Sequence, residues 1–247
     1  MDSVSIVIPA FNEERRLTAT LTAVLAYLAR RNWRFAEVVV VDDGSADGTA
    51  RLVREFSATH PAVRLVENPG NRGKGYSVRH GVMEARGEWI LFSDADLSAP
   101  IEELDKLLAA AREGGISVAI GSRALDRSLI EVHQSGFRET AGRVFNLCMR
   151  VLTGLPLRDT QCGFKLFEAG AAREIFGRQR LERFGFDVEV LFIARQLGCR
   201  MVEVPVRWRH SEGTKVSMFR DSLNMFLDLL RVRWNSLRGR YRQPPIR

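Results

Sequence analysis

The sequence has few cysteines and no long uninterrupted apolar segment. Cys148, Cys162 and Cys199 are too few and too scattered for a disulfide framework or a zinc site, and no CxxC pair occurs. This usage predicts a reducing, cytoplasmic compartment. No uncharged apolar run approaches the roughly 18 residues that a membrane-spanning helix needs, and the N-terminus lacks the features of a signal peptide. We therefore predict that the protein does not cross a bilayer by itself.

Acidic residues are absent after Asp228. Six arginines follow it: Arg231, Arg233, Arg238, Arg240, Arg242 and Arg247. They account for most of the net charge of +7, so the rest of the chain is close to neutral. A basic terminal segment favours an anionic surface, membrane or nucleic acid, and a solvated terminus is the alternative. Because no basic face with interleaved aromatic residues occurs, we expect no nucleic acid as a partner.

The first half of the sequence alternates β-branched runs with amphipathic segments. Strands are predicted at 4–8, 37–41, 63–66, 88–92 and 116–120. Helices are predicted between them, the first opening at Asn12 as its N-cap. This alternation predicts an α/β fold with a doubly wound, mostly parallel sheet and helices on both faces. Ligands of such sheets bind beyond the carboxyl ends of the strands, where the polar and glycine-rich segments fall.

The second half gives weaker signals. We interpret 124–139 as a long loop, 140–152 as a helix and 208–215 as a charged loop. The segment 158–167 is predicted to be a loop that runs into an edge strand. A short helix is predicted at 169–176. Residues 184–189 lead into a further helix that ends near 197, and a strand is predicted at 201–206.

Two carboxylates follow the strand at 88–92. In extended backbone, side chains at i and i+2 point the same way, so Asp94 and Asp96 can converge on one point. Two such carboxylates favour a cation between them, and Mg²⁺ or Mn²⁺ beside a diphosphate is bound in this way. The alternative is that these residues end a strand and cap the next helix.

The C-terminal segment predicts one amphipathic helix over 218–237. Its apolar residues are Phe219, Leu223, Phe226, Leu230, Trp234 and Leu237. Its polar face contains Arg220, Asp221, Asn224, Asp228, Arg231 and Asn235. Either the apolar face docks on the core of the protein, or it lies in a membrane interface with the arginines on anionic lipid. We predict a catalytic domain at 1–215, followed at 216–247 by this helix and a basic tail.

Several segments resemble family 2 glycosyltransferases of the GT-A fold. They are VIPAFNEE at 7–14, VVDDGS at 40–45, NRGKG at 71–75, FSDADLS at 92–98 and GSR at 121–123. Further segments look like dolichyl- or polyprenyl-phosphate glucosyltransferases and their mannosyltransferase relatives. These are DTQCGFKLF at 159–167, FDVEVL at 186–191, VEVPVRW at 202–208 and EGTKVS at 212–217. Eukaryotic members of the glucosyl branch carry an N-terminal membrane helix and many bacterial relatives C-terminal ones; this sequence shows neither pattern.

The resemblance implies an inverting enzyme that moves glucose from UDP-glucose to a polyprenyl or dolichyl phosphate, with Mg²⁺ or Mn²⁺ on Asp94 and Asp96. It would lie peripherally on the cytoplasmic face of a membrane. The residues expected to bind the nucleotide sugar are Pro9, Ala10, Phe11, Glu13, Asp42, Asp43, Asn71, Lys74, Gly75, Asp94, Ala95 and Asp96. Asp43 could instead cap the following helix.

The acceptor and catalytic residues come from the second half. Those expected at the acceptor phosphate or sugar are Arg123, Arg138, Gln161, Lys165 and Lys215. The catalytic set is Asp96, Arg123 and Asp187, where Asp187 acts as a base or binds a sugar hydroxyl, and an N-cap is its alternative. Since a phosphate nucleophile is already anionic near neutral pH, no strong general base is needed.

Other functions remain open at this point. Base selectivity rests on few loop contacts, so a GDP-mannose-dependent mannosyltransferase is the main alternative. A non-catalytic module that binds nucleotide sugars or lipid is a further one. A P-loop is absent, since GxxxxGK[ST] does not occur. A nucleotidyltransferase lacks support, because the glycine-rich signature expected after the first strand is missing.

Overall fold

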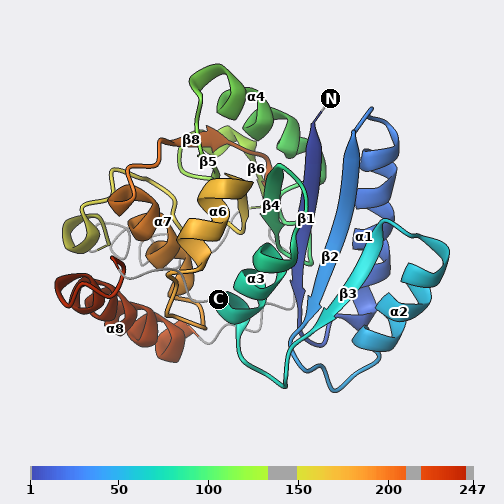
Figure 1. Cartoon of the computed structure of the whole chain (residues 1–247), viewed down its shortest axis with the longest axis horizontal. Coiled ribbons are helices and arrows are strands. Elements are labelled where there is room, and N and C mark those ends of the chain that lie inside the picture. The colour runs from blue at the N-terminus through green and yellow to red at the C-terminus, as the bar shows by residue number, and fades with distance from the viewer. Residues whose placement is uncertain (1, 133–148, 210–217, 243–247) are drawn as a thin grey trace.

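The computed structural model describes residues 2–132, 149–209 and 218–242. Its centre is a seven-stranded sheet in the order β3-β2-β1-β4-β7-β5-β8 (Figure 1). Its strands are β1 (Ser3–Ala10), β2 (Phe35–Asp42), β3 (Val63–Glu67), β4 (Trp89–Ser93), β5 (Val118–Ser122), β7 (Phe164–Glu168) and β8 (Met201–Pro205). All neighbouring pairs are parallel except those that β7 makes. The predicted α/β fold with a mostly parallel sheet is confirmed.

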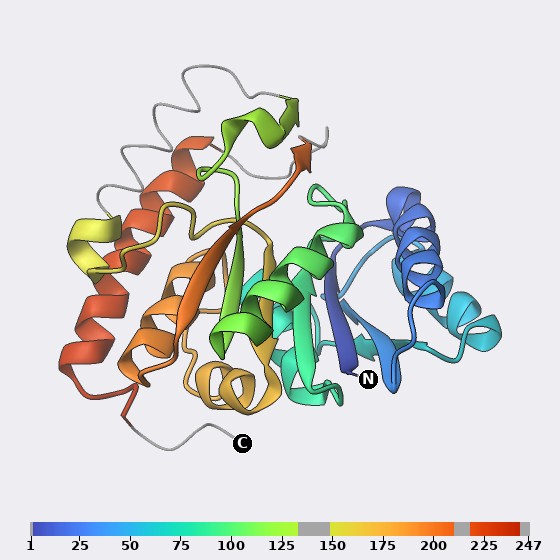
Figure 2. The ribbon, with the colours of Figure 1, turned by 90° about the horizontal axis from the view of Figure 1, so that it is seen from above.

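Helices cover both faces of the sheet. They are α1 (Glu14–Ala29), α2 (Thr49–Thr59), α3 (Lys74–Glu84), α4 (Leu104–Gly114), α6 (Ala169–Phe176), α7 (Phe186–Gln196) and α8 (Met218–Leu237), with short 3₁₀ turns η1 (Ile101–Glu103) and η2 (Arg127–Leu129). One buried cluster joins the sheet to α1, α2 and α4, and the other joins it to α3, α6, α7 and α8. In Figures 1 and 2, α8 lies at the opposite end of the molecule from α1 and α2.

Strand β7 lies in the interior of the sheet, antiparallel to both β4 and β5. The prediction of an edge strand at this place was wrong; β8 and β3 form the edges. Phe164 and Leu166 are buried in the cluster on one face of the sheet, and Phe167 is buried in the cluster on the other. Lys165, which suggests an exposed strand, is also fully buried because it forms an ion pair with Asp187. The reversed direction puts the beginning of β7 at the carboxyl ends of its neighbours.

A small second sheet pairs β6 (Ile130–Val132) with β9 (Trp208–Arg209). Both segments were expected to be loop. The backbone N–H of Arg209 donates to the carbonyl of Ser98, 2.8 Å away, which ties β9 to the loop that follows β4. The segments 133–148 and 210–217, which follow these strands in the sequence, lie outside the described residues.

Helix α1 begins at Glu14, and Glu13 precedes it without a side-chain cap. Asn12 is therefore not the N-cap that the sequence suggested. Its backbone adopts φ 54°, and its side-chain oxygen accepts hydrogen bonds from the N–H groups of Ala46 and Asp47. Asn12 thus links the loop after β1 to the loop after β2, which fixes these two loops relative to each other.

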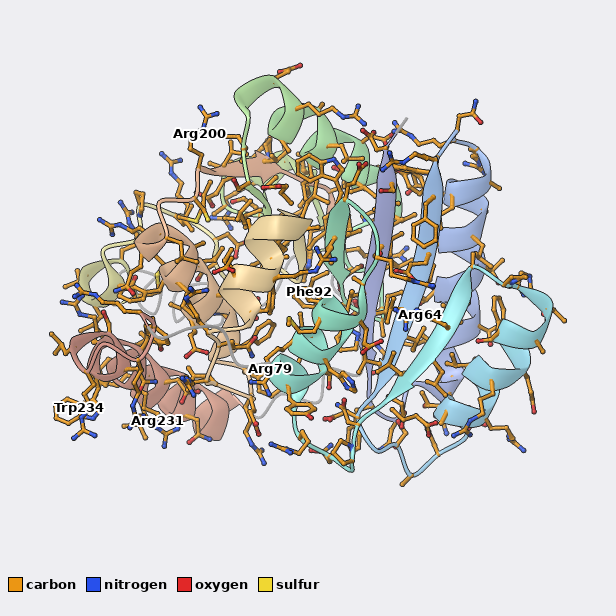
Figure 3. All side chains as sticks on the ribbon, viewed as in Figure 1. Arg64, Arg79, Phe92, Arg200, Arg231 and Trp234 are labelled. Atoms are coloured by element: carbon orange, nitrogen blue, oxygen red, sulfur yellow. The ribbon has the colours of Figure 1, made fainter. Side chains whose placement is uncertain are left out.

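Helix α8 packs on α7 with a mixed face rather than with its apolar stripe. Asp228, Leu229, Val232 and Asn235 are buried. Five large apolar side chains stay exposed: Phe226, Leu227, Leu230, Trp234 and Leu237. Figure 3 shows Trp234 at the periphery of the molecule. The helix docks on the core, as one alternative predicted, but the described part of its apolar stripe (Phe226, Leu230, Trp234 and Leu237) is not the docking face. No helix among the described residues is long and apolar enough to cross a membrane.

Candidate active site

The polar segments of the first half meet at one edge of the sheet. The parallel strands β1, β2, β4 and β5 all end there. Because β7 runs the other way, residues 159–163, which precede it, reach the same edge between β4 and β5. The site is therefore built from both halves of the sequence, as strand order places them side by side.

The loop after β4 forms a turn at Asp94 to Leu97, not the extended backbone that the sequence suggested. The N–H of Leu97 donates to the carbonyl of Asp94 over 3.2 Å, and Leu97 has φ 46°. Asp94 is nevertheless paired with a cation, on which Asp96 also acts electrostatically. The Lys74 ammonium lies 2.7 Å from Oδ1 of Asp94. Burial lowers the pKa of Lys74, but Asp94, Asp187 and Asp96 outweigh it, so the pKa lies above its ordinary value.

Gly163 allows the Asp94 carboxylate to take its position. Its carbonyl accepts a hydrogen bond from the N–H of Asp94, 3.2 Å away. A Cβ atom at this glycine would lie 1.9 Å from Oδ2 of Asp94. The carboxylate therefore occupies the space that any other residue at 163 would fill.

Lys165 and Asp187 form a buried pair beneath this carboxylate. Lys165 donates to Oδ1 of Asp187 and to the carbonyl of Cys162, and neither side chain has more than 5% of its surface exposed. Burial raises the pKa of the Asp187 carboxyl, and the two nearby lysines oppose this shift. Helix α7 has Gly185 as its N-cap and no side-chain cap, so Asp187 is not the cap that was the alternative.

Arg123 follows β5 and is held by Asp159. Its Nε and Nη2 atoms donate to the two carboxylate oxygens of Asp159 over 2.7 and 2.8 Å. Its guanidinium also lies 5.3 Å from the ring centre of Trp208. Burial lowers the pKa of Arg123, but the nearby Asp159 carboxylate outweighs this effect, so the pKa lies above its ordinary value. Asp94 makes a smaller contribution in the same direction. Arg123 is therefore a permanent cation that Asp159 holds at this edge of the sheet, and Asp94 also acts on it electrostatically.

Two adjacent acids end β2 and have different surroundings. Asp42 is 4% exposed; its Oδ2 atom accepts from the N–H of Ser45, and its buried Oδ1 atom has no hydrogen-bond partner in the described part of the chain. Asp43 bonds to Asn68 and to the N–H groups of Arg72 and Gly73. Asp43 thus holds the glycine-rich loop and caps no helix, whereas Asp42 retains an unused acceptor.

The other predicted nucleotide residues surround these acids. Ala10 and Ala95 are buried, Phe11 and Asn71 are exposed, and Pro9 is intermediate. Glu13 forms an ion pair with Arg16 at 2.7 Å. Gly75 is the second residue of α3, and a Cβ there would lie 2.7 Å from that of Phe186. The roles of these residues stay predictions. Arg138 and Lys215 lie outside the described residues.

Residues 159–163 include contacts that the sequence reasoning missed. Thr160 Oγ1 and Gln161 Nε2 are buried and lack a hydrogen-bond partner within the described residues. Gln161 was expected at the sugar or acceptor, whereas Asp159, Thr160 and Gly163 were not singled out. The block DTQCGFKLF pointed to the segment. It did not show that Asp159 faces Arg123 or that Gly163 faces Asp94, because both contacts join segments distant in sequence.

Asp94 and Asp96 have the chemistry of a Mg²⁺ or Mn²⁺ site. Oδ1 of Asp94 meets Lys74, and Oδ1 of Asp96 accepts from the N–H of Ser98, which leaves the Oδ2 atoms without a hydrogen bond from the described residues. Within those residues, no group of three or more His, Cys, Asp or Glu side chains could hold a metal ion. A cation here would therefore need phosphate oxygens or water to complete its coordination.

The geometry can be compared with known proteins. Residues 5–176 match the domain described as Glycosyl transferase family 2. The chain belongs to this family. A dolichyl-phosphate beta-glucosyltransferase of Drosophila melanogaster is 40% identical over 97% of this chain and 77% of its own length, and the enzyme of that name from Homo sapiens is 37% identical over the same shares. The resemblance inferred from the motifs is confirmed, and this family 2 chain is a glycosyltransferase.

A solved structure shares the fold of this family 2 glycosyltransferase. Glucosyl-3-phosphoglycerate synthase from Mycobacterium tuberculosis, in complex with Mn²⁺, UDP-glucose and phosphoglyceric acid, aligns over 98% of this chain and 81% of its own with a TM-score of 0.63. At 19% sequence identity this likeness establishes the GT-A type of fold.

Proposed function

We propose that this glycosyltransferase moves glucose from UDP-glucose to the phosphate of a dolichyl or other polyprenyl lipid. The observation that carries the proposal is the pair of cations beside Asp94, the Lys74 ammonium and the Arg123 guanidinium. A nucleoside diphosphate gains negative charge as the glycosidic bond breaks. Donors that are fixed before the reaction stabilise that charge without reorganisation.

The donor end of the site would be at the loops after β1 and β2. The unused Oδ1 atom of Asp42 is a buried acceptor that needs a donor, and the N–H of uracil or the hydroxyls of ribose supply one. The names of the curated relatives favour glucose, and the metal-bound UDP-glucose complex of the distant structure shows that this fold accepts such a donor. GDP-mannose remains the alternative donor.

Asp94 and Asp96 would hold Mg²⁺ or Mn²⁺. When bound, such a cation neutralises charge on the two phosphates of the leaving nucleotide. Lys74 would contribute a second, permanent positive charge to the same phosphates.

The acceptor phosphate would attack the anomeric carbon directly, with inversion. Because this phosphate is already anionic, the protein has to orient it and exclude water rather than deprotonate it. Arg123 uses its Nε and Nη2 atoms on Asp159, which leaves Nη1 for that phosphate as far as the described residues go, and the Nε2 atom of Gln161, also without a partner among them, lies on the neighbouring segment. Asp187, fixed by Lys165, would bind a sugar hydroxyl or act as a base.

Release of UDP from UDP-glucose, followed with and without undecaprenyl or dolichyl phosphate in detergent and with and without EDTA, tests the proposal. We expect lipid- and metal-dependent release, and a loss of about 10²–10³ in turnover for Asp96→Asn at unchanged melting temperature. Near-normal turnover of this variant would refute the metal assignment. Calorimetry that showed tight binding of GDP and none of UDP would favour the mannosyl alternative. Binding of UDP-glucose without turnover on either lipid would favour the non-catalytic module.

We propose further that the exposed face of α8 lies on an anionic membrane, which is where a polyprenyl phosphate resides. Its stripe contains Phe226, Leu230, Trp234 and Leu237. Beyond the stripe, Arg231, Arg233, Arg238, Arg240 and Arg242 are exposed, and Arg238 lies 4.3 Å from the ring centre of Trp234. In Figure 3 the side chains of Trp234 and Arg231 point away from the sheet. The combination of apolar, aromatic and basic groups suits a headgroup region.

Leu230→Glu tests this location, with Leu197→Glu as its control because Leu197 is similarly exposed, 39% against 44%, at the end of α7. We expect sedimentation with phosphatidylglycerol vesicles for the wild type and for the control, and its loss for Leu230→Glu. Equal sedimentation of all three proteins would contradict the proposal. A salt-resistant dimer of the wild type that Leu230→Glu dissociates would assign the face to a second copy instead.

A further inference from the structure

Glu189 is a buried acid in α7 that the proposed chemistry does not use. It has no exposed surface, and it lies two residues after Asp187. Its Oε2 atom accepts hydrogen bonds from the backbone N–H groups of Arg180 and Leu181, at 3.0 and 2.7 Å. Its Oε1 atom accepts from the hydroxyl of Tyr241, at 2.7 Å. Both carboxylate oxygens of Glu189 are therefore used in hydrogen bonds within the protein.

The backbone that Glu189 holds shapes the glycine-rich loop of the donor site. The carbonyl of Glu182 accepts from the N–H of Tyr76 at 3.0 Å, and the Gln179 side chain donates to the carbonyls of Gly75 and Leu181. The fit leaves no room: a Cβ at Gly73 would lie 2.6 Å from the carbonyl oxygen of Glu182. The segment 179–183 is thus the surface on which residues 73–76 rest.

Lys74 lies within that loop, so the position of the loop determines the position of the Lys74 ammonium in the candidate site. It is the first residue of α3, and its ammonium meets Asp94. A shift of the segment 179–183 would move the backbone on both sides of Lys74. Since the loop packs against this segment without slack, such a shift displaces the ammonium from the place where the diphosphate is expected.

The other partner of Glu189 comes from the far end of the chain. Tyr241 follows α8, is 2% exposed, and packs its ring on Phe192 with 6.1 Å between ring centres. Asn235 of α8 lies 3.4 Å from the Tyr241 hydroxyl. Tyr241 thus holds one oxygen of the Glu189 carboxylate, and the N–H groups of Arg180 and Leu181 hold the other. Through Tyr241 and Glu189, the C-terminal end of α8 is connected to the segment 179–183.

We propose that Glu189, held by Tyr241, is a positioning residue for the donor nucleotide: it fixes the segment 179–183, which sets the glycine-rich loop and Lys74. This role rests on the proposed binding of a nucleotide sugar at that loop. Glu189 contacts no substrate. Its loss would weaken the binding of UDP and raise the KM for UDP-glucose, and it would leave the KM for the lipid acceptor unchanged.

Tyr241→Phe is the main test, because it removes one hydroxyl and keeps the ring. Tyr27→Phe is the matched control: Tyr27 is similarly buried, and its hydroxyl also donates to a carboxylate, that of Asp105, on the other face of the sheet. The affinity for UDP would be measured by calorimetry, together with melting temperature and the KM of both substrates. We expect both variants to lose similar stability, and only Tyr241→Phe to bind UDP roughly three- to ten-fold more weakly, the effect of about one hydrogen bond.

Glu189→Gln provides the conservative rescue. Its amide oxygen can accept both backbone N–H groups and its amide nitrogen can donate to Tyr241, so UDP affinity should stay within about two-fold of the wild type, a loss smaller than that of one hydrogen bond. Glu189→Ala should lose at least as much affinity as Tyr241→Phe.

Equal UDP affinity of Tyr241→Phe and Tyr27→Phe would overturn the inference and leave Glu189 a structural residue. So would an equal rise of both KM values in Tyr241→Phe. If the wild type itself bound neither UDP nor GDP, the proposed function would fail first, so the two failures are distinguishable.

Discussion

Two lysine–aspartate pairs share the aromatic ring of Phe92, and they differ in burial. The ammonium groups of Lys74 and Lys165 lie 5.2 and 5.7 Å from the ring centre. Figure 3 shows Phe92 in the interior, near the centre of the sheet. The side chains of Lys74 and Asp94 are 25% and 32% exposed, whereas those of Lys165 and Asp187 are 1% and 5% exposed. The same two side-chain types therefore form one partly exposed pair and one pair whose ammonium is sealed from solvent.

The buried pair, Lys165 and Asp187, should contribute more to the stability of the fold than the partly exposed pair. Lys165→Met leaves the Asp187 carboxylate buried without its counter-charge, so we expect a loss of about 3–5 kcal/mol in the free energy of unfolding, measured by urea denaturation. The double variant with Asp187→Leu removes both charges and should recover much of this loss. If the double variant were as unstable as the single one, packing around Lys165 rather than its charge would be responsible.

The partly exposed pair, Lys74 and Asp94, should contribute more to kcat than the buried pair. Lys74→Met should lower kcat by about 10²–10³, since one fixed positive charge at the leaving group is lost. The free energy of unfolding should change by less than about 1 kcal/mol, as for other partly exposed ion pairs. Lys106→Met is the control, because Lys106 also meets a carboxylate, that of Glu103, at 2.6 Å but on η1 and α4. A Lys74→Met enzyme with normal kcat, or a Lys106→Met enzyme with an equal loss, would remove the distinction between the pairs.

Glu189 extends the comparison to a buried acid that has no cation as a hydrogen-bond partner. Burial raises its pKa from 4.5 to about 7, opposed by the hydrogen bonds of Leu181, Tyr241 and Arg180, while the nearby Asp228 adds to the rise. The folded state therefore binds a proton that the unfolded state has released. The stability this proton gives is complete below pH 4.5 and is lost as the pH rises through about 7.

A glutamine at position 189 cannot ionise, so the stability of the Glu189→Gln variant should not fall as the pH rises through about 7. We expect its free energy of unfolding, relative to the wild type, to rise by up to about 3 kcal/mol between acidic and neutral pH. Taking the difference between the two proteins cancels the titration of Asp228, which is paired with Arg231. A difference that stays constant across the pH range would mean that Glu189 has the same pKa in the folded and unfolded states.

The sequence predicted the regions whose signals are local. Runs such as Val38–Val41 and the helical spacing of Leu17, Leu21 and Val24 identify elements without reference to the rest of the chain, and all of them are buried as expected. Strand ends follow from the same patterns, so the edge that carries Asp42 and Asp94 could be located. The resemblance of the motifs then supplied the family.

Features that depend on distant partners were not predictable. The burial of Lys165 depends on Asp187, which is 22 residues away and on another element, so the sequence did not show it. The docking face of α8 depends on Leu229, Val232 and the bond from Tyr241 to Glu189, none of which follows from helical period alone. Asn12 had the composition of a cap, but its bonds to Ala46 and Asp47 required the neighbouring loop.

The reversed direction of β7 bears on where the chain tolerates changes in length. The chain leaves the sheet after β5 at Ser122 and re-enters it at Phe164, on the same edge. Because the connection between Ser122 and Phe164 begins and ends on the same edge of the sheet, its length can change without shifting the register of any strand. Insertions or deletions between Ser122 and Phe164 would therefore alter the surroundings of Arg123 and Asp159 while leaving the seven-stranded sheet unchanged.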